Sequence, residues 1–156
     1  MEAPVWFMNK IANPLVRLVL RSPLHSLFSA SLLLITYRGR KTGREYSLPV
    51  QYAQTDSLIY IVPGAPEQKT WWRNMKGGAP VRLALRGHIL QGNAILLSQH
   101  VDTEEILDGF GLYLRRFPAL IKYHHIRVEA DGSFNIEDLR SAALRAVIIR
   151  VELKEK

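Results

Sequence analysis

The sequence predicts a mainly β (α+β) protein built around a small barrel of about six mostly antiparallel strands. Residues 32–98 read as one β-rich segment after another, and tight turns join most of these segments. A short helix separates the third strand from the fourth, and a last strand follows two helices near the end of the chain. Because short connections favour antiparallel pairing, this order indicates a small barrel rather than a doubly wound sheet.

Composition limits the classes to which the protein can belong. The 156 residues are 47% hydrophobic and 22% charged, which predicts one folded domain over residues 1–156. The absence of cysteine excludes disulfides, thiolate nucleophiles, iron–sulfur clusters and cysteine-based zinc sites. The sequence has neither a signal peptide nor an apolar run of transmembrane length, which favours a cytoplasmic protein.

The charge balance favours an anionic partner. Lys and Arg number 21 against 14 Asp and Glu, so the net charge is +7. A phosphorylated cofactor, an anionic membrane surface and a nucleic acid all fit this sign of charge.

Residues 1–30 are expected to form a helical segment in short pieces. An Asn-Pro pair and a Ser-Pro pair each place a capping residue directly before proline, which is tolerated at the first helical position. The two helices are expected over residues 13–21 and 23–29. Their apolar and basic composition suits packing across the barrel or against a second subunit, which we favour. Peripheral contact of residues 5–28 with an anionic membrane is the alternative.

The strands are predicted from apolar or alternating runs that end at turn residues. They are expected at residues 32–38, 45–53, 58–62, 81–86, 88–98 and 146–153. A glycine-containing turn at residues 39–43 joins the first two strands, and Pro63 with Gly64 stops the third. Gly92, inside the fifth strand, predicts a β-bulge.

Three helices are predicted after the first strands. A short one is expected over residues 70–76, closed by two glycines. Asp102 with Glu105 has the pattern of a capping box and begins a longer helix, which Pro118 ends. Asn135 is the expected start of the last helix, which runs to residue 144 or 145.

The turn between the first two strands is the first candidate for binding chemistry. Four cations and two glycines occupy the seven residues 38–44. Glycine lets the backbone turn sharply and expose N–H groups that bind anions, and arginine can bind two phosphate oxygens at once. These residues predict a phosphate site. A solvated basic hairpin tip is the alternative, and the spacing of a Walker A loop is missing.

Two further segments contain candidate residues. Trp71 and Trp72 are adjacent on the short helix, where neighbouring side chains point about 100° apart. One of them can therefore face a cleft while the other enters the core, and packing of both in the core is the simpler alternative. The aromatic and basic stretch 113–125 can line a substrate pocket and supply a proton donor. No third ligand accompanies His124 and His125, so no metal site is predicted.

The combination of these segments resembles a known family. The matching residues are Gly39-Arg40-Lys41-Thr42-Gly43, Pro49, Pro63-Gly64, Trp71-x-x-Asn74-Met75 and Pro80-Val81. Over about residues 32–97 their spacing is similar to that of the deazaflavin-dependent nitroreductase family, small split β-barrel proteins related to the FMN-binding barrels. The resemblance implies that residues 31–156 form a split barrel with a C-terminal helix and last strand.

The resemblance also implies which residues hold the phosphate of a deazaflavin, coenzyme F420. These are Arg40, Lys41 and Thr42. Pro49 would shape the groove in which the cofactor lies. The family tends to have another arginine three positions before this proline, where the present chain has Tyr46. Arg44 is the candidate to replace that arginine.

The ring of the deazaflavin is implied to lie beside a second set of residues. These are Pro63, Gly64 and Ala65, with Trp71 and Asn74 behind them. Tyr123 is the candidate catalytic proton donor, because the family often carries tyrosines after the long helix. The implied reaction is hydride transfer to or from an electron-poor substrate such as a quinone, enone or nitro compound.

Several alternatives remain open from the sequence. The same fold suits FMN, haem or a lipid-like ligand without turnover of F420, because a basic phosphate turn does not distinguish these ligands. A nucleic-acid-binding module is not favoured, since no recognised motif is present and the cations are spread along the chain. A homodimer is expected, because barrels of this kind often form dimers.

Overall fold

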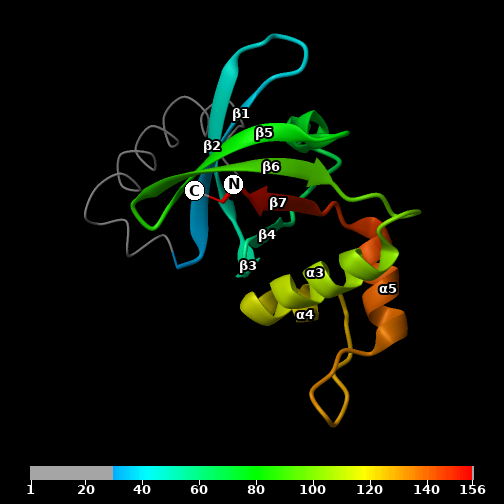
Figure 1. The fold of residues 1–156 in the computed structure, drawn as a ribbon. Helices are drawn as coiled ribbons and strands as arrows, with labels where there is room; N and C mark the ends of the chain where they lie inside the picture. The colour runs from blue at the N-terminus through cyan, green and yellow to red at the C-terminus, as the bar shows by residue number, and fades with distance from the viewer. Residues whose placement is uncertain (1–29, 156) are drawn as a thin grey trace, which may run out of the picture.

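A computed structural model describes residues 30–155 and shows a curled sheet of seven strands with helices beside it (Figure 1). The strands are β1 (Leu32–Arg38), β2 (Glu45–Gln51), β3 (Ala53–Thr55), β4 (Leu58–Ile61), β5 (Ala79–Leu85), β6 (His88–Leu96) and β7 (Ile149–Leu153). The helices are η3 (Trp71–Met75), α3 (Thr103–Arg116), α4 (Ala119–Tyr123) and α5 (Ile136–Arg145). The strand order is β2-β1-β5-β6-β7-β4-β3, and all neighbouring pairs are antiparallel. The predicted antiparallel barrel is confirmed, with one strand more than expected.

The connection from β2 to β3 makes the sheet curl. These strands lie at opposite edges of the sheet, yet only Tyr52 separates Gln51 from Ala53. The two edges must therefore meet at this corner, where the Tyr52 N–H donates to the Ser31 carbonyl at 3.3 Å. The single strand predicted over residues 45–53 is divided here, because its two parts pair with different neighbours.

The inside of the curl holds the main hydrophobic core. Successive side chains of a strand point to opposite faces, so alternate residues of each strand reach it. Its buried aliphatic members on strands β1, β2, β4, β5 and β7 are Leu33, Ile35, Val50, Ile59, Ile61, Val81, Leu83, Leu85, Ile149 and Val151. Because these residues come from strands near both edges, the cluster closes the curl. Met75 of η3 joins it and is fully buried.

Helices α3 and α5 pack on the outer face of the sheet around β4 (Figure 1). The buried members of this second cluster include Tyr60, Ile106, Phe110, Leu114, Leu139 and Ile148. Glu105 also connects α3 to the sheet, because its carboxylate accepts the Tyr60 hydroxyl at 3.2 Å and Arg150 Nη1 at 2.9 Å. Gly109 lets α3 approach β4 closely, since a Cβ at this position would lie 2.6 Å from the Tyr60 ring.

The β-bulge predicted at Gly92 is wrong. Gly92 pairs in regular register with Val81 on one side and Leu153 on the other. Glycine is needed here for a different reason. A Cβ would lie 2.8 Å from the Glu152 carbonyl oxygen and from Val151 Cγ1. The glycine therefore marks a close approach of β7 and not an extra residue in β6.

The two predicted helix caps have different outcomes. The Asn135 Oδ1 accepts the Asp138 N–H at 3.1 Å, so the predicted start of α5 is confirmed. The capping box predicted at Asp102 is wrong, because the Asp102 side chain makes no cap hydrogen bond to α3. Its carboxylate instead accepts the Ser98 N–H at 2.7 Å, which fixes the turn before the helix.

Some predictions fall on residues that the structure does not describe. The helices expected over 13–21 and 23–29 lie outside residues 30–155, as does the membrane contact assigned to 5–28. These stay predictions. Within the described range, no helix has both the length and the apolar character needed to cross a membrane.

The buried phenol of Tyr113 on α3 gives the fold a predictable response to alkaline pH. Burial raises the pKa of Tyr113 to about 12, from 10.0 for a free tyrosine. The neutral phenol therefore stabilises the fold fully below pH 10, and this contribution is lost as the pH rises towards 12. At about pH 11 the loss is about 1.4 kcal/mol.

The variant Tyr113→Phe has no phenol to ionise at this position. Between about pH 9 and about pH 11, its free energy of unfolding should fall by about 1.4 kcal/mol less than that of the unmodified protein. Urea unfolding at the two pH values measures the difference. An equal fall in both proteins would contradict the assignment.

Candidate functional site

The turn between β1 and β2, residues 39–44, is called the basic turn below. Its backbone closes on itself, because the Gly39 N–H donates to the Arg44 carbonyl at 2.7 Å and the Gly43 N–H to the Gly39 carbonyl at 2.9 Å. The Arg44 N–H points to Thr42 Oγ1 at 3.3 Å. These N–H groups are therefore used inside the turn. Among the described residues, only the N–H groups of Lys41 and Thr42 in this turn have no partner, so the exposed backbone that the sequence indicated is limited to these two groups.

Asn74 connects the basic turn to η3. Its Oδ1 accepts the Arg40 N–H at 2.9 Å, and its Nδ2 donates to the Trp71 carbonyl at 2.8 Å. Arg40 Nη1 also donates to the Arg73 carbonyl at 3.3 Å. Arg40 and Asn74 are 34 residues apart in the sequence. The two segments that the resemblance assigned to the phosphate and to the ring therefore lie next to each other.

A row of three aromatic rings leads from the basic turn to η3. Tyr46 stacks on Tyr37 with centroids 5.8 Å apart, and Tyr37 lies 6.1 Å from Trp71. The Tyr46 hydroxyl lies 3.1 Å from Thr42 Oγ1. Gly39 leaves room for both groups, because a Cβ there would lie 2.8 Å from Tyr46 Cε2 and 2.9 Å from Thr42 Oγ1. We call Tyr46, Tyr37 and Trp71 the aromatic row.

The two tryptophans of η3 have different surroundings. Trp71 belongs to the aromatic row, whereas Trp72 Nε1 donates to the Pro66 carbonyl at 3.0 Å. The Arg73 guanidinium lies over the Trp72 ring at 5.4 Å. Both indoles are half-buried and pack against the inner core, so neither is completely enclosed in it. Their divergence follows from the angle between neighbouring side chains of a helix.

The segment implied to approach the cofactor ring lies between β4 and η3. Pro63 is buried, whereas Gly64 and Ala65 are exposed. Ala65 has a φ of 47°, in the left-handed region, and its carbonyl accepts the Gln68 N–H at 3.0 Å. The bond from Trp72 to Pro66 holds the end of this segment on η3.

Pro49 is not part of this arrangement. It pairs with Leu34, whereas Tyr46 pairs with Tyr37. Pro49 and Tyr46 are an odd number of residues apart on the same strand, so their side chains lie on opposite faces of the sheet. Pro49 therefore does not face the aromatic row, and its position on the edge strand β2 suits a residue without an N–H group.

Tyr123 lies apart from the basic turn as well. It is the last residue of α4, which Figure 1 shows at the other end of the molecule from the turn between β1 and β2. Its side chain is 75% exposed, and its ring meets His124 edge-on at 5.0 Å. The structure therefore brings together the basic turn, Trp71 and Asn74 but not the predicted proton donor.

Sequence reasoning missed the position of Tyr46. It was noted only as the residue that stands in place of an arginine. The signal was the alternation along β2, which places Tyr46 on the same face as Leu48 and Val50. Its role as the exposed end of the aromatic row depends on Tyr37, a cross-strand neighbour.

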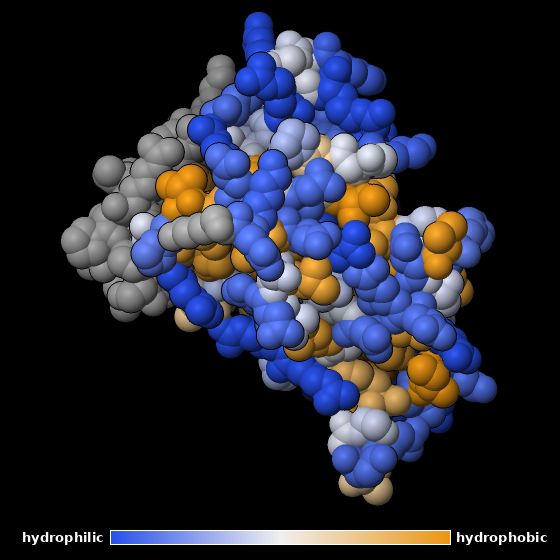
Figure 2. Space-filling view, viewed as in Figure 1, coloured by the Kyte–Doolittle hydropathy of each residue, from blue (hydrophilic) through white to orange (hydrophobic). Residues whose placement is uncertain are grey.

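Charge is concentrated at the same end of the molecule. Figure 2 shows hydrophilic residues gathered at the end that carries the turn between β1 and β2. Arg40, Lys41, Arg44 and Arg73 are exposed there. Within residues 30–155, none of the four forms an ion pair. Their charges are therefore available to an anionic ligand.

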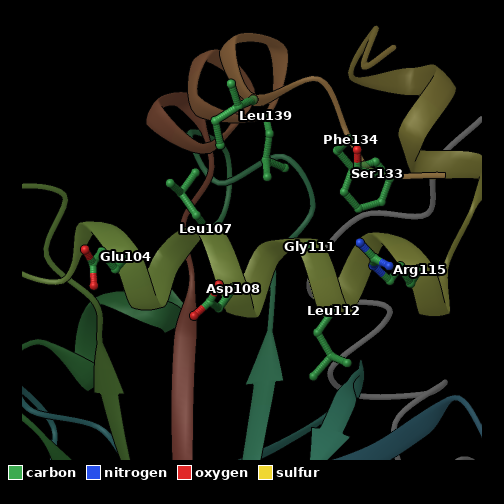
Figure 3. Close-up of a pocket in the computed structure, with 10 residues that line it drawn as sticks. Glu104, Leu107, Asp108, Gly111, Leu112, Arg115, Ser133, Phe134 and Leu139 are labelled. Atoms are coloured by element: carbon green, nitrogen blue, oxygen red, sulfur yellow. The ribbon is translucent and has the colours of Figure 1, made fainter. Parts of the chain in front are cut away.

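A hollow of about 410 Å³ lies elsewhere, between α3, α5 and the segment before α5 (Figure 3). Leu107, Phe134 and Leu139 form the apolar part of its lining. Asp108 and Glu104 add two carboxylates. Among the residues that line it, Arg115 is the cation, and its guanidinium lies 5.0 Å over the Phe134 ring. Carboxylates repel phosphate, so this hollow suits a phosphorylated cofactor less well than the basic turn does.

Comparison with known families decides the class of protein. Residues 22–107, more than half of the chain, match the model of the F420H(2)-dependent quinone reductase family. The chain belongs to this family. As a member of the F420H(2)-dependent quinone reductase family it is an oxidoreductase that depends on F420. The resemblance to deazaflavin-dependent enzymes is thereby confirmed.

Solved structures support the fold of this family member. An F420-H2-dependent reductase, FDR-A, is 17% identical with a TM-score of 0.54, and the match covers 78% of this chain and 94% of that chain. A structure named as a domain-swapped dimer has the same identity and TM-score and covers 78% and 80%. Identities this low establish the fold alone, and the split β-barrel is confirmed. No curated protein sequence matches the chain.

Proposed function

We propose that the chain binds F420 where the basic turn meets the aromatic row and transfers hydride between F420 and an electron-poor organic substrate. The observation that carries the proposal is the direct connection of the basic turn to η3 through Asn74. It creates one place that offers both positive charge and a flat aromatic surface. The substrates proposed are a quinone, an enone or a nitro compound, and family membership favours the quinone.

Side chains of the basic turn hold the phosphate in this proposal. Arg40, Lys41 and Arg44 supply three exposed cations for charge-assisted hydrogen bonds. Thr42 and Tyr46 supply a pair of hydroxyls 3.1 Å apart. One hydroxyl hydrogen is shared within this pair, and the other is left for an outside acceptor. The residues present therefore fit an anionic group without the arginine that the family tends to carry at position 46.

The ring is proposed to lie against the aromatic row, at its Trp71 end, and against residues 63–65. When bound, the deazaflavin supplies the hydride chemistry. The chain's own residues bind it, orient it and exclude water on the side of the aromatic row. Burial raises the pKa of Tyr37 to about 12, with Tyr46 beside it as a smaller cause, so this phenol keeps its proton at neutral pH.

Tyr123 remains a predicted proton donor, outside the cluster that carries the proposal. The variant Tyr123→Phe tests it alone, because the side chain is 75% exposed and its removal should leave the fold unchanged. Turnover of Tyr123→Phe at the rate of the unmodified protein would remove Tyr123 from the mechanism.

Binding and turnover of F420 test the proposed function directly. The purified full chain is titrated with F420 and, separately, with FMN, and absorbance is followed. Reduced F420 is then mixed with a quinone, and its oxidation is followed. Saturable binding of F420 and faster oxidation with enzyme are expected. Binding of FMN but not F420 would overturn the proposal in favour of the FMN alternative, and binding of neither would overturn both.

Two partner predictions also stand as proposals. A homodimer is supported by a similar solved structure that is named as a domain-swapped dimer, and light scattering of the purified chain tests it. Contact of residues 5–28 with an anionic membrane is tested by co-sedimentation with anionic vesicles. A chain that stays in the supernatant would end the membrane proposal.

A further inference from the structure

We infer that Asn74 is a positioning residue, which sets the spacing between the basic turn and the aromatic row and does not contact the cofactor. The inference rests on the proposed function. It replaces the cofactor contact that the sequence implied for Asn74. It concerns only how the two halves of the site are held relative to each other.

Both ends of the Asn74 carboxamide are already used by the protein. Oδ1 accepts the Arg40 N–H at 2.9 Å, and Nδ2 donates to the Trp71 carbonyl at 2.8 Å. The side chain is half-buried. Among the described residues, Asn74 is the only one whose side chain is bonded both to the backbone of the basic turn and to the backbone of η3. Asn74 therefore holds two segments of the protein together, and both polar atoms of its side chain already have a partner in the protein.

The two main-chain groups that Asn74 binds belong to Arg40 and Trp71, which lie in the two halves of the proposed site. Arg40 and its neighbour Lys41 are the proposed phosphate cations, so fixing the Arg40 backbone fixes the point from which both side chains reach out. Trp71 is the end of the aromatic row, so a bond to its carbonyl fixes the start of η3. One carboxamide thus sets the distance between charge and ring.

Apart from the packing of Tyr37 against Trp71, few contacts set that distance. η3 is a single turn of 3-10 helix of five residues, and its N-cap Thr70 makes no side-chain hydrogen bond. Such short 3-10 segments have poorer hydrogen-bond geometry and are weakly determined by their own backbone. The other direct bond, from Arg40 Nη1 to the Arg73 carbonyl, is long at 3.3 Å and exposed. It also uses the guanidinium that the proposed phosphate needs.

The fold does not depend on Asn74 to keep η3 in place. Met75 is fully buried in the inner core, and Trp72 is bonded to the Pro66 carbonyl. Loss of the Asn74 carboxamide should therefore leave η3 attached while its spacing from the basic turn relaxes. A cofactor that binds at two points gains affinity from both only when the distance between the two binding points matches the distance between its own two groups.

The test compares the intact cofactor with probes for its two halves. Asn74→Leu has a side chain of similar size and removes both hydrogen bonds. The probes are F420, inorganic phosphate as a competitor, and a deazaflavin chromophore without phosphate. Asn74→Leu should bind F420 about tenfold more weakly, because the two halves of the site no longer keep the spacing that the intact cofactor needs, while affinity for each half probe stays within about twofold. The thermal unfolding midpoint should stay close to that of the unmodified protein.

A matched control and three contrary results make the test decisive. Asn93→Leu makes the same substitution at an exposed position of β6 and should leave F420 binding unchanged. Unchanged F420 binding by Asn74→Leu would overturn the inference. A tenfold loss for the chromophore alone would show direct contact with the ring, and equal loss for all probes with a lower unfolding midpoint would show a merely structural role. Failure of the unmodified chain to bind F420 would instead overturn the proposed function.

Discussion

Replacing Arg40 and Lys41 together by alanine should weaken F420 binding by about two to four powers of ten. Each side chain is proposed to make one charge-assisted hydrogen bond to the phosphate, and each such bond contributes on the order of 1.5–3 kcal/mol. Both cations are exposed and have no ion-pair partner among the described residues. Four of the six N–H groups of the turn are used within the protein, so the backbone replaces the two lost side chains only in part.

Absorbance titration with F420 measures this loss, and a charge-matched control separates local binding from the overall charge. Lys122→Ala with Arg140→Ala removes the same two charges from α4 and α5, where both residues are exposed. The control should change F420 affinity by less than about threefold, since exposed charges farther apart than about 10 Å are largely screened at 0.1 M salt. Equal losses in the two double variants would show that net charge, and not the basic turn, attracts the cofactor.

Replacing Gly109 by alanine should lower the free energy of unfolding by about 2 kcal/mol. The new Cβ would lie 2.6 Å from two atoms of the Tyr60 ring, closer than atoms can pack. The ring cannot swing aside easily, because it is 5% exposed and its hydroxyl donates to Glu105 at 3.2 Å. Either α3 or the ring must shift, and such overpacking typically costs about 1–3 kcal/mol.

The second glycine of the same helix is the matched control. A Cβ at Gly111 would meet the Phe134 ring at 3.8 Å, an ordinary contact. Gly111→Ala should therefore stabilise the protein by about 0.5–1 kcal/mol through helix propensity alone. Urea unfolding of both variants gives the two values. Destabilisation of similar size in both variants would contradict the role assigned to the Tyr60 contact.

Local signals in the sequence were enough for most individual elements. β1 was expected over residues 32–38 and lies at Leu32–Arg38, because an apolar run that ends at a glycine turn determines its own limits. Asn135 caps α5 as expected, since the cap involves only residues three positions apart. The basic turn and the adjacent tryptophans, which form the candidate site, were also identified as candidates from the sequence.

Local signals were insufficient where two distant segments compete for the same group. The Asp102 carboxylate had both a helix N-terminus and the turn before the helix within reach, and it binds Ser98. Gly92 had the pattern of a bulge, although its absent side chain makes room for β7. The predicted strand over residues 45–53 is divided because its second part pairs at the other edge of the sheet.

The sequence by itself determined the family, most of the strands and the two segments, basic and aromatic, that form the candidate site. Only the tertiary structure decided that Asn74 joins those segments, that Tyr46 stacks on Tyr37 beside the basic turn, and that Pro49 and Tyr123 lie apart from them. The physical reason is the range of the interactions. Strands and turns follow from side chains a few residues apart, whereas the bond from Arg40 to Asn74 spans 34 residues and forms only once distant parts of the chain have come together.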